Sequence, residues 1–274
     1  MVKLSVGMIV FNTVSTLPEK MMELCVQSIY PYAHEIILVE GATSASNGHY
    51  WDGDTSTFTK DGRSNDGTLD VLRRLESLNK VKVIYGFNYW PGKTTMCNCY
   101  SRIANGTHIL HLDSDEFYHP EDMEKIIHHL EANPQLSQID FYANHFWGGW
   151  NYCIDEREKG WGNDPPWRRI FKHTPGKSYW LSHEPPVYLN QGLPTYSMQV
   201  CNRDETLAMG IKLFHYGYVH YPQIDFKTKF YRNEQYPILW RKFQEDRSTK
   251  IFGSNVYPFI GQHPKIIKEA YDLL

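Results

Sequence analysis

Two aspartates, Asp113 and Asp115, are the residues of this sequence whose type and spacing point most directly to chemistry. They follow an apolar segment, 107–112, that predicts a short strand, and side chains two residues apart on a strand point to the same side. Two carboxylates so close repel each other unless a cation lies between them. Because Mg²⁺ and Mn²⁺ prefer oxygen ligands and keep positions open for phosphate oxygens, the pair predicts a divalent-metal site. The alternative is a turn at the end of the strand with solvated acids.

The composition indicates a globular protein with one large domain, or one domain and a small appendage. The chain has 274 residues, of which 41% are hydrophobic and 22% charged, so a sizeable buried core is expected. The net charge of -3 gives no sign of a basic surface for nucleic acid. Aromatic residues make up 15% of the chain, which suits a densely packed core or stacking on sugars and bases.

The cysteines and the hydropathy bear on the cellular compartment. Five cysteines are irregularly spaced, and the pair Cys97 and Cys99 lacks the spacing of a zinc knuckle, so we expect reduced thiols in a cytoplasmic protein. The apolar segment 4–11 is too short for a signal peptide. No stretch approaches the roughly 18 apolar residues of a membrane span, so any work at a membrane would occur by peripheral docking.

The first 115 residues alternate between predicted strands and helices. Strands are predicted at 3–11, 35–39, 81–85 and 109–112, and helices at 17–29, 68–78 and 94–104. This alternation predicts an α/β fold with a mostly parallel sheet flanked by helices, and ligands beyond the carboxyl ends of the strands. Glu40 and Asp113 each follow a strand directly, so both should face that edge. The polar stretch 43–67 is long enough to be a lid or a disordered loop.

The second half of the chain has a different pattern. A helix is predicted at 121–130, short aromatic strands at 138–145, 168–172 and 212–219, an amphipathic helix at 225–243 and a short helix at 265–273. This pattern predicts a smaller, mixed, aromatic-rich part that completes the site. We expect a catalytic domain at 1–220, with halves at 1–116 and 117–220, and a C-terminal helical extension at 221–274.

The order of these features resembles the GT-A glycosyltransferases, particularly the family 2-like group within the nucleotide-diphospho-sugar transferase superfamily. The matching segments are the first strand at 6–12, the second strand with its acidic residue at 36–40, the Asp-Gly-Thr turn at 64–68, the run from Gly92-Lys93 through Asn98, and the Asp-x-Asp motif at 109–115. The resemblance implies a Rossmann-like GT-A sheet. Two departures leave the nucleotide open: Glu40 stands where the family usually has Asp, and a long insertion displaces the Asp-Gly-Thr turn.

The resemblance implies a metal site and a donor site. The metal ligands would be Asp113, Asp115 and a late histidine, His215, around Mn²⁺ or Mg²⁺. The donor would be a nucleotide-diphosphate sugar of the UDP or GDP type, and its implied contacts are Phe11, Asn12, Glu40, Lys93 and Ser114. The structural alternatives are a His215 bonded to a backbone carbonyl and a solvated Lys93.

The resemblance also implies a catalytic base, which would remove the proton from the acceptor hydroxyl group. Glu184 is the first candidate, because it lies in a rigid Pro-flanked segment, Ser182-His-Glu-Pro-Pro186, and Asp164 is the second. The alternative for Glu184 is a structural role in its own loop.

Further candidates lie near the implied acceptor site. Arg168 or Arg169 would hold the diphosphate, because guanidinium pairs bidentately with phosphate oxygens. Trp147, Trp150 and Trp161 would stack on an acceptor sugar. The alternatives are a solvated strand for the arginines and core packing for the tryptophans.

The implied activity is a metal-dependent, hexosyltransferase-like sugar transfer to a hydroxyl group of a glycan or glycoconjugate, with inversion at the sugar carbon. Two other readings of the sequence are a nucleotidyltransferase and a non-catalytic carbohydrate- or nucleotide-binding protein. The first would need a Gly-rich loop after the first strand, and segment 11–15 has no glycine. The intact Asp-x-Asp motif argues against the second.

Overall fold

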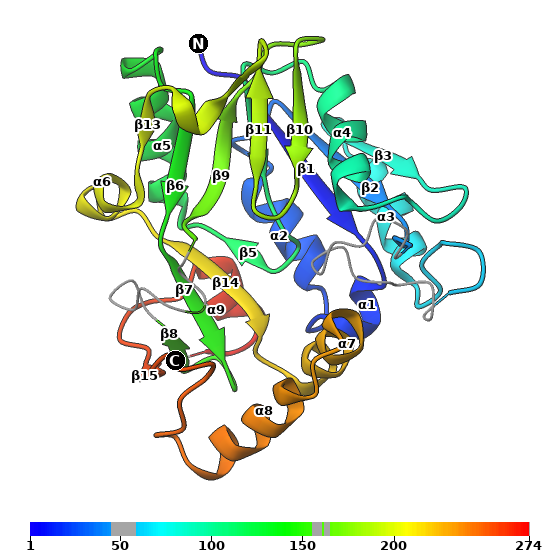
Figure 1. The fold of residues 1–274 in the computed structure, drawn as a ribbon, viewed down its shortest axis with the longest axis vertical. Helices are drawn as coiled ribbons and strands as arrows, with labels where there is room; N and C mark the ends of the chain where they lie inside the picture. Colours follow the sequence, from blue (N-terminus) through cyan, green and yellow to red (C-terminus); the bar gives the residue numbers. More distant parts are fainter. Residues whose placement is uncertain (45–58, 155–160, 162–164, 274) are drawn as a thin grey trace.

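A seven-stranded sheet forms the centre of the molecule, a computed structural model that describes residues 1–44, 59–154, 161 and 165–273 (Figure 1). In spatial order its strands are β13 (Val200–Cys201), β6 (Gln138–Phe141), β9 (Trp167–Lys172), β4 (His108–His111), β1 (Leu4–Val10), β2 (Glu35–Glu40) and β3 (Val81–Tyr85). The strands β4, β1, β2 and β3 pair in parallel, and β9 runs antiparallel to both of its neighbours. The predicted α/β class with a mostly parallel sheet is confirmed.

Both faces of this sheet are covered, which explains why β2 has an uninterrupted apolar stretch at 36–39. Alternate residues of β2 enter different cores: Ile36 and Leu38 pack on one face, Ile37 and Val39 on the other. The first face carries α2 (Met21–Ile29), α3 (Thr68–Glu76) and α5 (Pro120–Ala132). The second carries α4 (Lys93–Ile103) and a small sheet of β10 (Ser178–Ser182), β11 (Val187–Asn190) and β12 (Leu193–Pro194).

A second, mixed sheet joins the C-terminal half to the end of β4. Its order is β15 (Tyr257–Pro258), β8 (Tyr152–Ile154), β7 (Ala143–Trp147), β14 (Leu213–Tyr218) and β5 (Glu116–Phe117). Strand β14 lies between β7 and β5, so His215 stands opposite His145 on one side and Glu116 on the other. Strand β5 begins one residue after Asp115, so this pairing brings residues about 100 positions apart to the edge of the large sheet.

Three predicted elements are wrong in their extent. The helix predicted at 225–243 is two helices, α7 (Tyr221–Tyr231) and α8 (Gln235–Glu245), because Arg232 adopts the left-handed conformation at φ 50° and ends the first. The strand predicted at 138–145 is divided between β6 and β7, which belong to different sheets. The helix predicted at 17–29 begins at Met21, after the short α1 (Thr13–Thr16).

The remaining helices are α6 (Arg203–Ala208), the short 3₁₀ helix η3 (Thr195–Ser197) and α9 (Lys265–Ala270). None of the five cysteines forms a disulfide bond in the structure. Within the described ranges, no helix combines the length and the apolar character needed to cross a bilayer.

The buried carboxylate of Glu35, at the start of β2, connects three neighbouring segments. It accepts hydrogen bonds of 2.7 Å from the Ser5 hydroxyl group, the Asn105 backbone N–H and the Lys82 ammonium group. Burial raises the pKa of the Glu35 carboxyl group, but these hydrogen bonds outweigh burial and lower the pKa below its ordinary value of 4.5. The ionised form therefore stabilises the fold.

Replacing Glu35 by Gln is expected to lower the free energy of unfolding at pH 7 by about 1–2 kcal/mol, because hydrogen bonds to charged groups are the stronger kind. The pKa is lower in the folded state, so the carboxylate's contribution is complete above about pH 4.5 and disappears as the pH falls through the folded-state pKa. Urea unfolding of both proteins from neutral to acidic pH measures this. The two stabilities should converge at acidic pH, and a constant difference would contradict the assignment.

Candidate functional site

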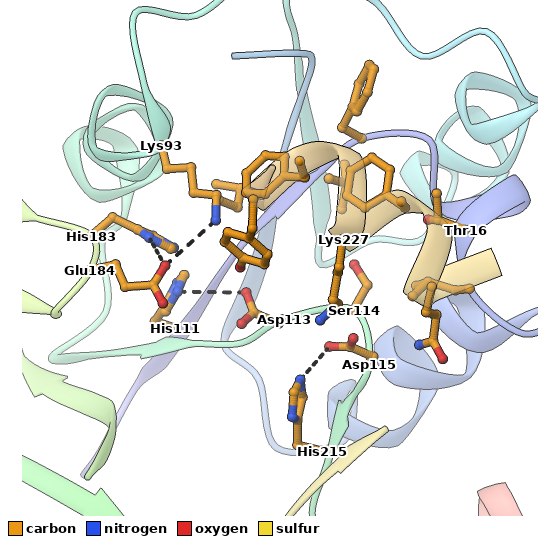
Figure 2. Close-up of a pocket in the computed structure, with 18 of the residues that line it drawn as sticks. Thr16, Lys93, His111, Asp113, Ser114, Asp115, His183, Glu184, His215 and Lys227 are labelled. Carbon is orange, nitrogen blue, oxygen red and sulfur yellow. Dashed lines mark ion pairs between the residues drawn. The ribbon is translucent and has the colours of Figure 1, made fainter. Parts of the chain in front are cut away.

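A cavity of about 580 Å³ lies beyond the carboxyl ends of β1, β2 and β4 (Figure 2). Its lining includes Phe11 after β1, Gly41 after β2 and the segment 113–115 after β4. The C-terminal half supplies the opposite wall. Of the residues predicted for the site, the cavity brings together Phe11, Lys93, Asp113, Ser114, Asp115, Glu184 and His215.

Asp113 and Asp115 lie in a turn between β4 and β5, so the predicted extended backbone is wrong at this point. Strand β4 ends at His111, and the turn is closed by a 3.0 Å hydrogen bond from the Glu116 N–H to the Asp113 carbonyl oxygen. The Tyr216 N–H donates to the Asp115 carbonyl oxygen at 2.8 Å, which fixes the turn to β14. Both aspartate side chains nevertheless face the cavity.

The buried guanidinium group of Arg169 is bonded to two carboxylates of this segment. It donates to both carboxylate oxygens of Glu116, with Nε 2.8 Å from Oε2, and to Asp113 Oδ2 at 3.3 Å. Burial would raise the pKa of the Asp113 carboxyl group, but the nearby Arg169 holds it well below its ordinary value. Arg169 therefore keeps Asp113 ionised, and its donors are directed at protein carboxylates. Arg168 donates to the Pro186 carbonyl oxygen at 3.1 Å.

Asp115 faces a pair of buried histidines. Asp115 Oδ1 lies 3.7 Å from His215 Nε2, and His215 Nδ1 is hydrogen-bonded to His145 Nδ1 at 2.7 Å. Burial lowers the pKa of both imidazoles, that of His145 to about 3, so both are neutral at physiological pH. One of the two Nδ1 atoms must carry the hydrogen; when His215 donates it, Nε2 presents a lone pair to Asp115. A hydrogen bond at the ring nitrogen that does not bind the metal, such as the one between His215 and His145, orients metal-ligating histidines.

A second group of possible ligands lies on the other side of Asp113. His111, Asp113 and His183 each offer a ligand atom, and these atoms lie within 4.8 Å of one another. His111 Nδ1 is hydrogen-bonded to the Tyr100 hydroxyl group at 3.0 Å, which leaves Nε2 directed at Asp113 Oδ1, 3.9 Å away. His183 is buried, and neither ring nitrogen has a hydrogen-bond partner among the described residues.

The sequence interpretation missed these two histidines, although signals for both were present. His111 precedes Asp113 by two residues, the same spacing that made Asp113 and Asp115 a pair. His183 is the neighbour of Glu184. Each signal is weak alone, because buried histidines are common in cores.

Glu184 and Lys93 form an ion pair at the cavity wall, with Oε2 3.8 Å from Nζ. His183 Nδ1 lies 3.9 Å from the same oxygen. Enclosure in the cavity raises the pKa of the Glu184 carboxyl group, and the positive charge of Lys93 opposes that change. The side chain is 37% exposed, so the carboxylate remains accessible to a ligand in the cavity (Figure 2).

Two residues predicted to contact the donor, Asn12 and Glu40, lie outside the described lining of the cavity. Asn12 Oδ1 accepts the Asn65 N–H at 3.0 Å, and Glu40 Oε1 accepts the Ser64 N–H at 2.7 Å. Both side chains thus hold the turn before α3 against the ends of β1 and β2. Glu40 Oε2 is buried without a hydrogen-bond partner among the described residues, and burial raises the pKa of this carboxyl group.

The three candidate tryptophans take three different positions. Trp147 is fully buried among aromatic residues, so it is unable to stack on an acceptor. Trp161 lines the cavity, and Trp150 packs on Tyr271. Asp164, the second candidate base, and segment 45–58 of the predicted lid lie outside the described residues.

Comparison with known proteins adds a family match. Residues 57–185 match the family model of glycosyl transferase family 2. No curated protein matches the chain.

Similar solved structures include S. aureus TarS 1-349 in complex with UDP-GlcNAc, with 16% identity, 53% of this chain and 35% of that chain covered, and a TM-score of 0.38. Another is the mannosyltransferase PcManGT from Pyrobaculum calidifontis in complex with GDP-Man and Mn²⁺, with 18% identity, 52% and 36% coverage, and a TM-score of 0.37. The chain spans about a third of the length of these two structures. The resemblance predicted from the sequence is confirmed by residues 57–185, which match glycosyl transferase family 2.

Proposed function

We propose that this protein is a metal-dependent glycosyltransferase that moves a sugar from a nucleotide-diphosphate donor, of the UDP or GDP type, to a hydroxyl group of a glycan or glycoconjugate. The observation that carries the proposal is the cavity at the carboxyl ends of the parallel strands. It is lined by Asp113, Asp115 and His215, and also by Glu184. Carboxylates and a neutral imidazole suit a divalent ion on a diphosphate, and a further carboxylate suits proton transfer.

The proposed ligands of Mn²⁺ or Mg²⁺ are Asp113, Asp115 and His215. A ligand set of two carboxylates and one neutral imidazole suits Mn²⁺ better than it suits a softer metal. The 3.7 Å between Asp115 Oδ1 and His215 Nε2 is too long for a hydrogen bond and short enough for both atoms to contact one ion. When bound, the ion would act as a Lewis acid that stabilises negative charge on the leaving diphosphate.

Glu184 is the proposed catalytic base. It would accept the proton of the acceptor hydroxyl group while the oxygen forms a bond to the sugar C1. The bond between C1 and the diphosphate oxygen breaks in the same step, and the nucleoside diphosphate leaves with the bonding electrons. A single displacement of this kind inverts the configuration at C1. A carboxyl pKa raised by enclosure is nearer the working pH, which favours general-base catalysis.

The second ligand group, His111, Asp113 and His183, supports a different metal. Two imidazoles and one carboxylate are typical of sites for iron or zinc. The set Asp113, Asp115 and His215 has two carboxylates and suits Mn²⁺ or Mg²⁺ better than this group does.

Release of nucleoside diphosphate tests the proposed function. The protein is incubated with UDP- and GDP-sugars, with Mn²⁺ or with EDTA, and the nucleoside diphosphate released when water takes up the sugar is quantified. We expect release from one donor class, dependent on the metal and lost in Asp115→Asn. Absence of release from every donor, with the protein folded and a nucleotide bound, would favour the non-catalytic binding protein. Release of pyrophosphate from nucleoside triphosphates would favour a nucleotidyltransferase.

Gly217 provides a separate test of the histidine ligand. A Cβ atom at this position would lie 2.5 Å from His215 Nε2, and His215 is held by His145 and packed against Trp167. Gly217→Ala is therefore expected to displace the His215 ring and to weaken Mn²⁺ binding by about 10-fold or more. This is the usual effect of changing a residue that orients a metal ligand. Titration of free Mn²⁺ by electron paramagnetic resonance measures this. Unchanged Mn²⁺ affinity in a folded variant would argue against His215 as a ligand.

A further inference from the structure

Among the described residues, three cationic side chains line the cavity, and they differ in their partners. Arg169 is bonded to Glu116 and Asp113, and Lys93 is paired with Glu184. For Lys227, on α7, no carboxylate oxygen of a described residue lies within 4.0 Å of Nζ. Its contact is with an aromatic ring, since Nζ lies 4.1 Å from the centroid of Tyr218.

The position of Lys227 directs its charge toward the turn that holds the aspartates. Figure 2 shows the side chain extending from α7 toward Ser114 and Asp115. A Cβ atom on Gly217 would lie 2.9 Å from Lys227 Nζ and 2.5 Å from His215 Nε2, so both nitrogen atoms border the space that this glycine leaves open. The ammonium group therefore lies beside the proposed metal ligands, on the cavity side.

A half-buried ammonium group without an anionic partner costs free energy, unless a ligand supplies the missing charge. The Asp115 carboxylate acts on Lys227 electrostatically, but no ion pair within 4.0 Å joins the two side chains. The Ser114 hydroxyl group, in the same part of the cavity, is also buried without a hydrogen-bond partner among the described residues. An ammonium donor and a free hydroxyl group at one place suit a phosphate group, which offers several acceptor oxygens.

We propose that Lys227 binds the diphosphate of the nucleotide donor and stabilises the negative charge on the leaving nucleoside diphosphate. This inference rests on the proposed function and adds a binding residue from the segment 221–274, which the sequence suggested was an extension beside the catalytic domain. Helix α7 contributes Phe226, Phe230 and Tyr231 to the same wall of the cavity. The C-terminal segment thus completes the donor site, and a chain without it would lack one cation for the diphosphate.

Lys229 provides a matched control on the same helix. Its side chain is 57% exposed and pairs with Asp225 at 2.7 Å, one helical turn away. Removing either lysine changes the net charge by the same amount, so a general electrostatic effect would appear in both variants. Of these two lysines on α7, Lys227 lines the cavity and Lys229 does not.

Isothermal titration calorimetry with UDP, GDP, uridine and guanosine tests the proposal on the wild type and on Lys227→Met, Lys227→Arg and Lys229→Met. We expect Lys227→Met to weaken binding of the preferred nucleoside diphosphate by about 10- to 100-fold, the range for a hydrogen bond to a charged group. Binding of the nucleoside, which lacks phosphate, should remain unchanged. Lys227→Arg should restore part of the affinity, and Lys229→Met should match the wild type.

The outcomes separate this inference from the proposed function. Equal affinity of the wild type and Lys227→Met for the diphosphate would overturn the role of Lys227 and leave the proposed function standing. An equal loss of affinity for the nucleoside and for the nucleoside diphosphate would show that Lys227 has a structural role, and it would also overturn the proposed contact with the diphosphate. A wild type that binds neither UDP nor GDP would overturn both. Repeating the titration in EDTA should preserve the effect of Lys227→Met, and a loss seen only with Mn²⁺ would overturn direct contact.

Discussion

Glu184→Gln is expected to reduce the rate of sugar transfer by about 10²- to 10⁴-fold, the usual contribution of a general base. Gln has nearly the same shape as Glu but is unable to accept the proton of the acceptor hydroxyl group. Donor affinity should stay close to that of the wild type, because the proposed base contacts the acceptor. The measurement is the rate of nucleoside diphosphate release at saturating donor, together with donor affinity by calorimetry.

The control for this substitution is Glu19→Gln, since the Glu19 side chain is 86% exposed and is not part of the described cavity lining. The control variant should retain the wild-type rate. A rate for Glu184→Gln within a few-fold of the wild type would remove Glu184 from the mechanism. Asp164, the second candidate from the sequence, would then be the residue to replace.

Arg169→Met is expected to have the largest effect on stability, lowering the free energy of unfolding by about 3–5 kcal/mol. Glu116 is fully buried, and Arg169 is the cation that both of its carboxylate oxygens contact. Removing the guanidinium group leaves a buried carboxylate uncompensated. Asp113 would also lose its 3.3 Å partner, so metal binding should weaken along with stability.

Urea unfolding measures this effect, and two further variants make it specific. Arg73→Met removes a surface arginine that pairs with Asp70 at 2.6 Å, and it should cost less than about 1 kcal/mol. The double variant Arg169→Met with Glu116→Gln should be more stable than Arg169→Met alone, because the uncompensated charge is gone. A double variant that is no more stable than the single one would show that the arginine acts through packing.

The large sheet could be predicted from the sequence because its signals are local. Predominantly apolar segments at 4–10 and 35–40, separated by a helical stretch, indicate two buried parallel strands and their crossover from the local sequence alone. The same is true of Asp113 and Asp115, whose spacing indicates a joint function. Their backbone was predicted less well, because β4 ends at His111 for reasons of pairing with β1 and β9.

Other parts of the site depend on contacts between distant residues. His215 faces Asp115 only because β14 pairs with β5 and β7, and Lys227 reaches the same place from a helix that the sequence placed in an extension. No periodicity in the sequence specifies either contact. Glu40 illustrates the opposite case. Its position directly after the predicted strand at 35–39 predicted a ligand contact, yet its carboxylate is bonded to the Ser64 N–H.

The central claim is that the cavity holds a divalent ion and a nucleotide diphosphate between the Asp113–Asp115 turn and helix α7. A crystal structure with Mn²⁺ and the nucleoside diphosphate that the protein prefers, with the ion located by anomalous diffraction, tests it most directly. We expect one manganese peak in contact with Asp113, Asp115 and His215, with the diphosphate between the ion and Lys227. A peak at His111 and His183, or a nucleotide bound outside the cavity, would contradict it.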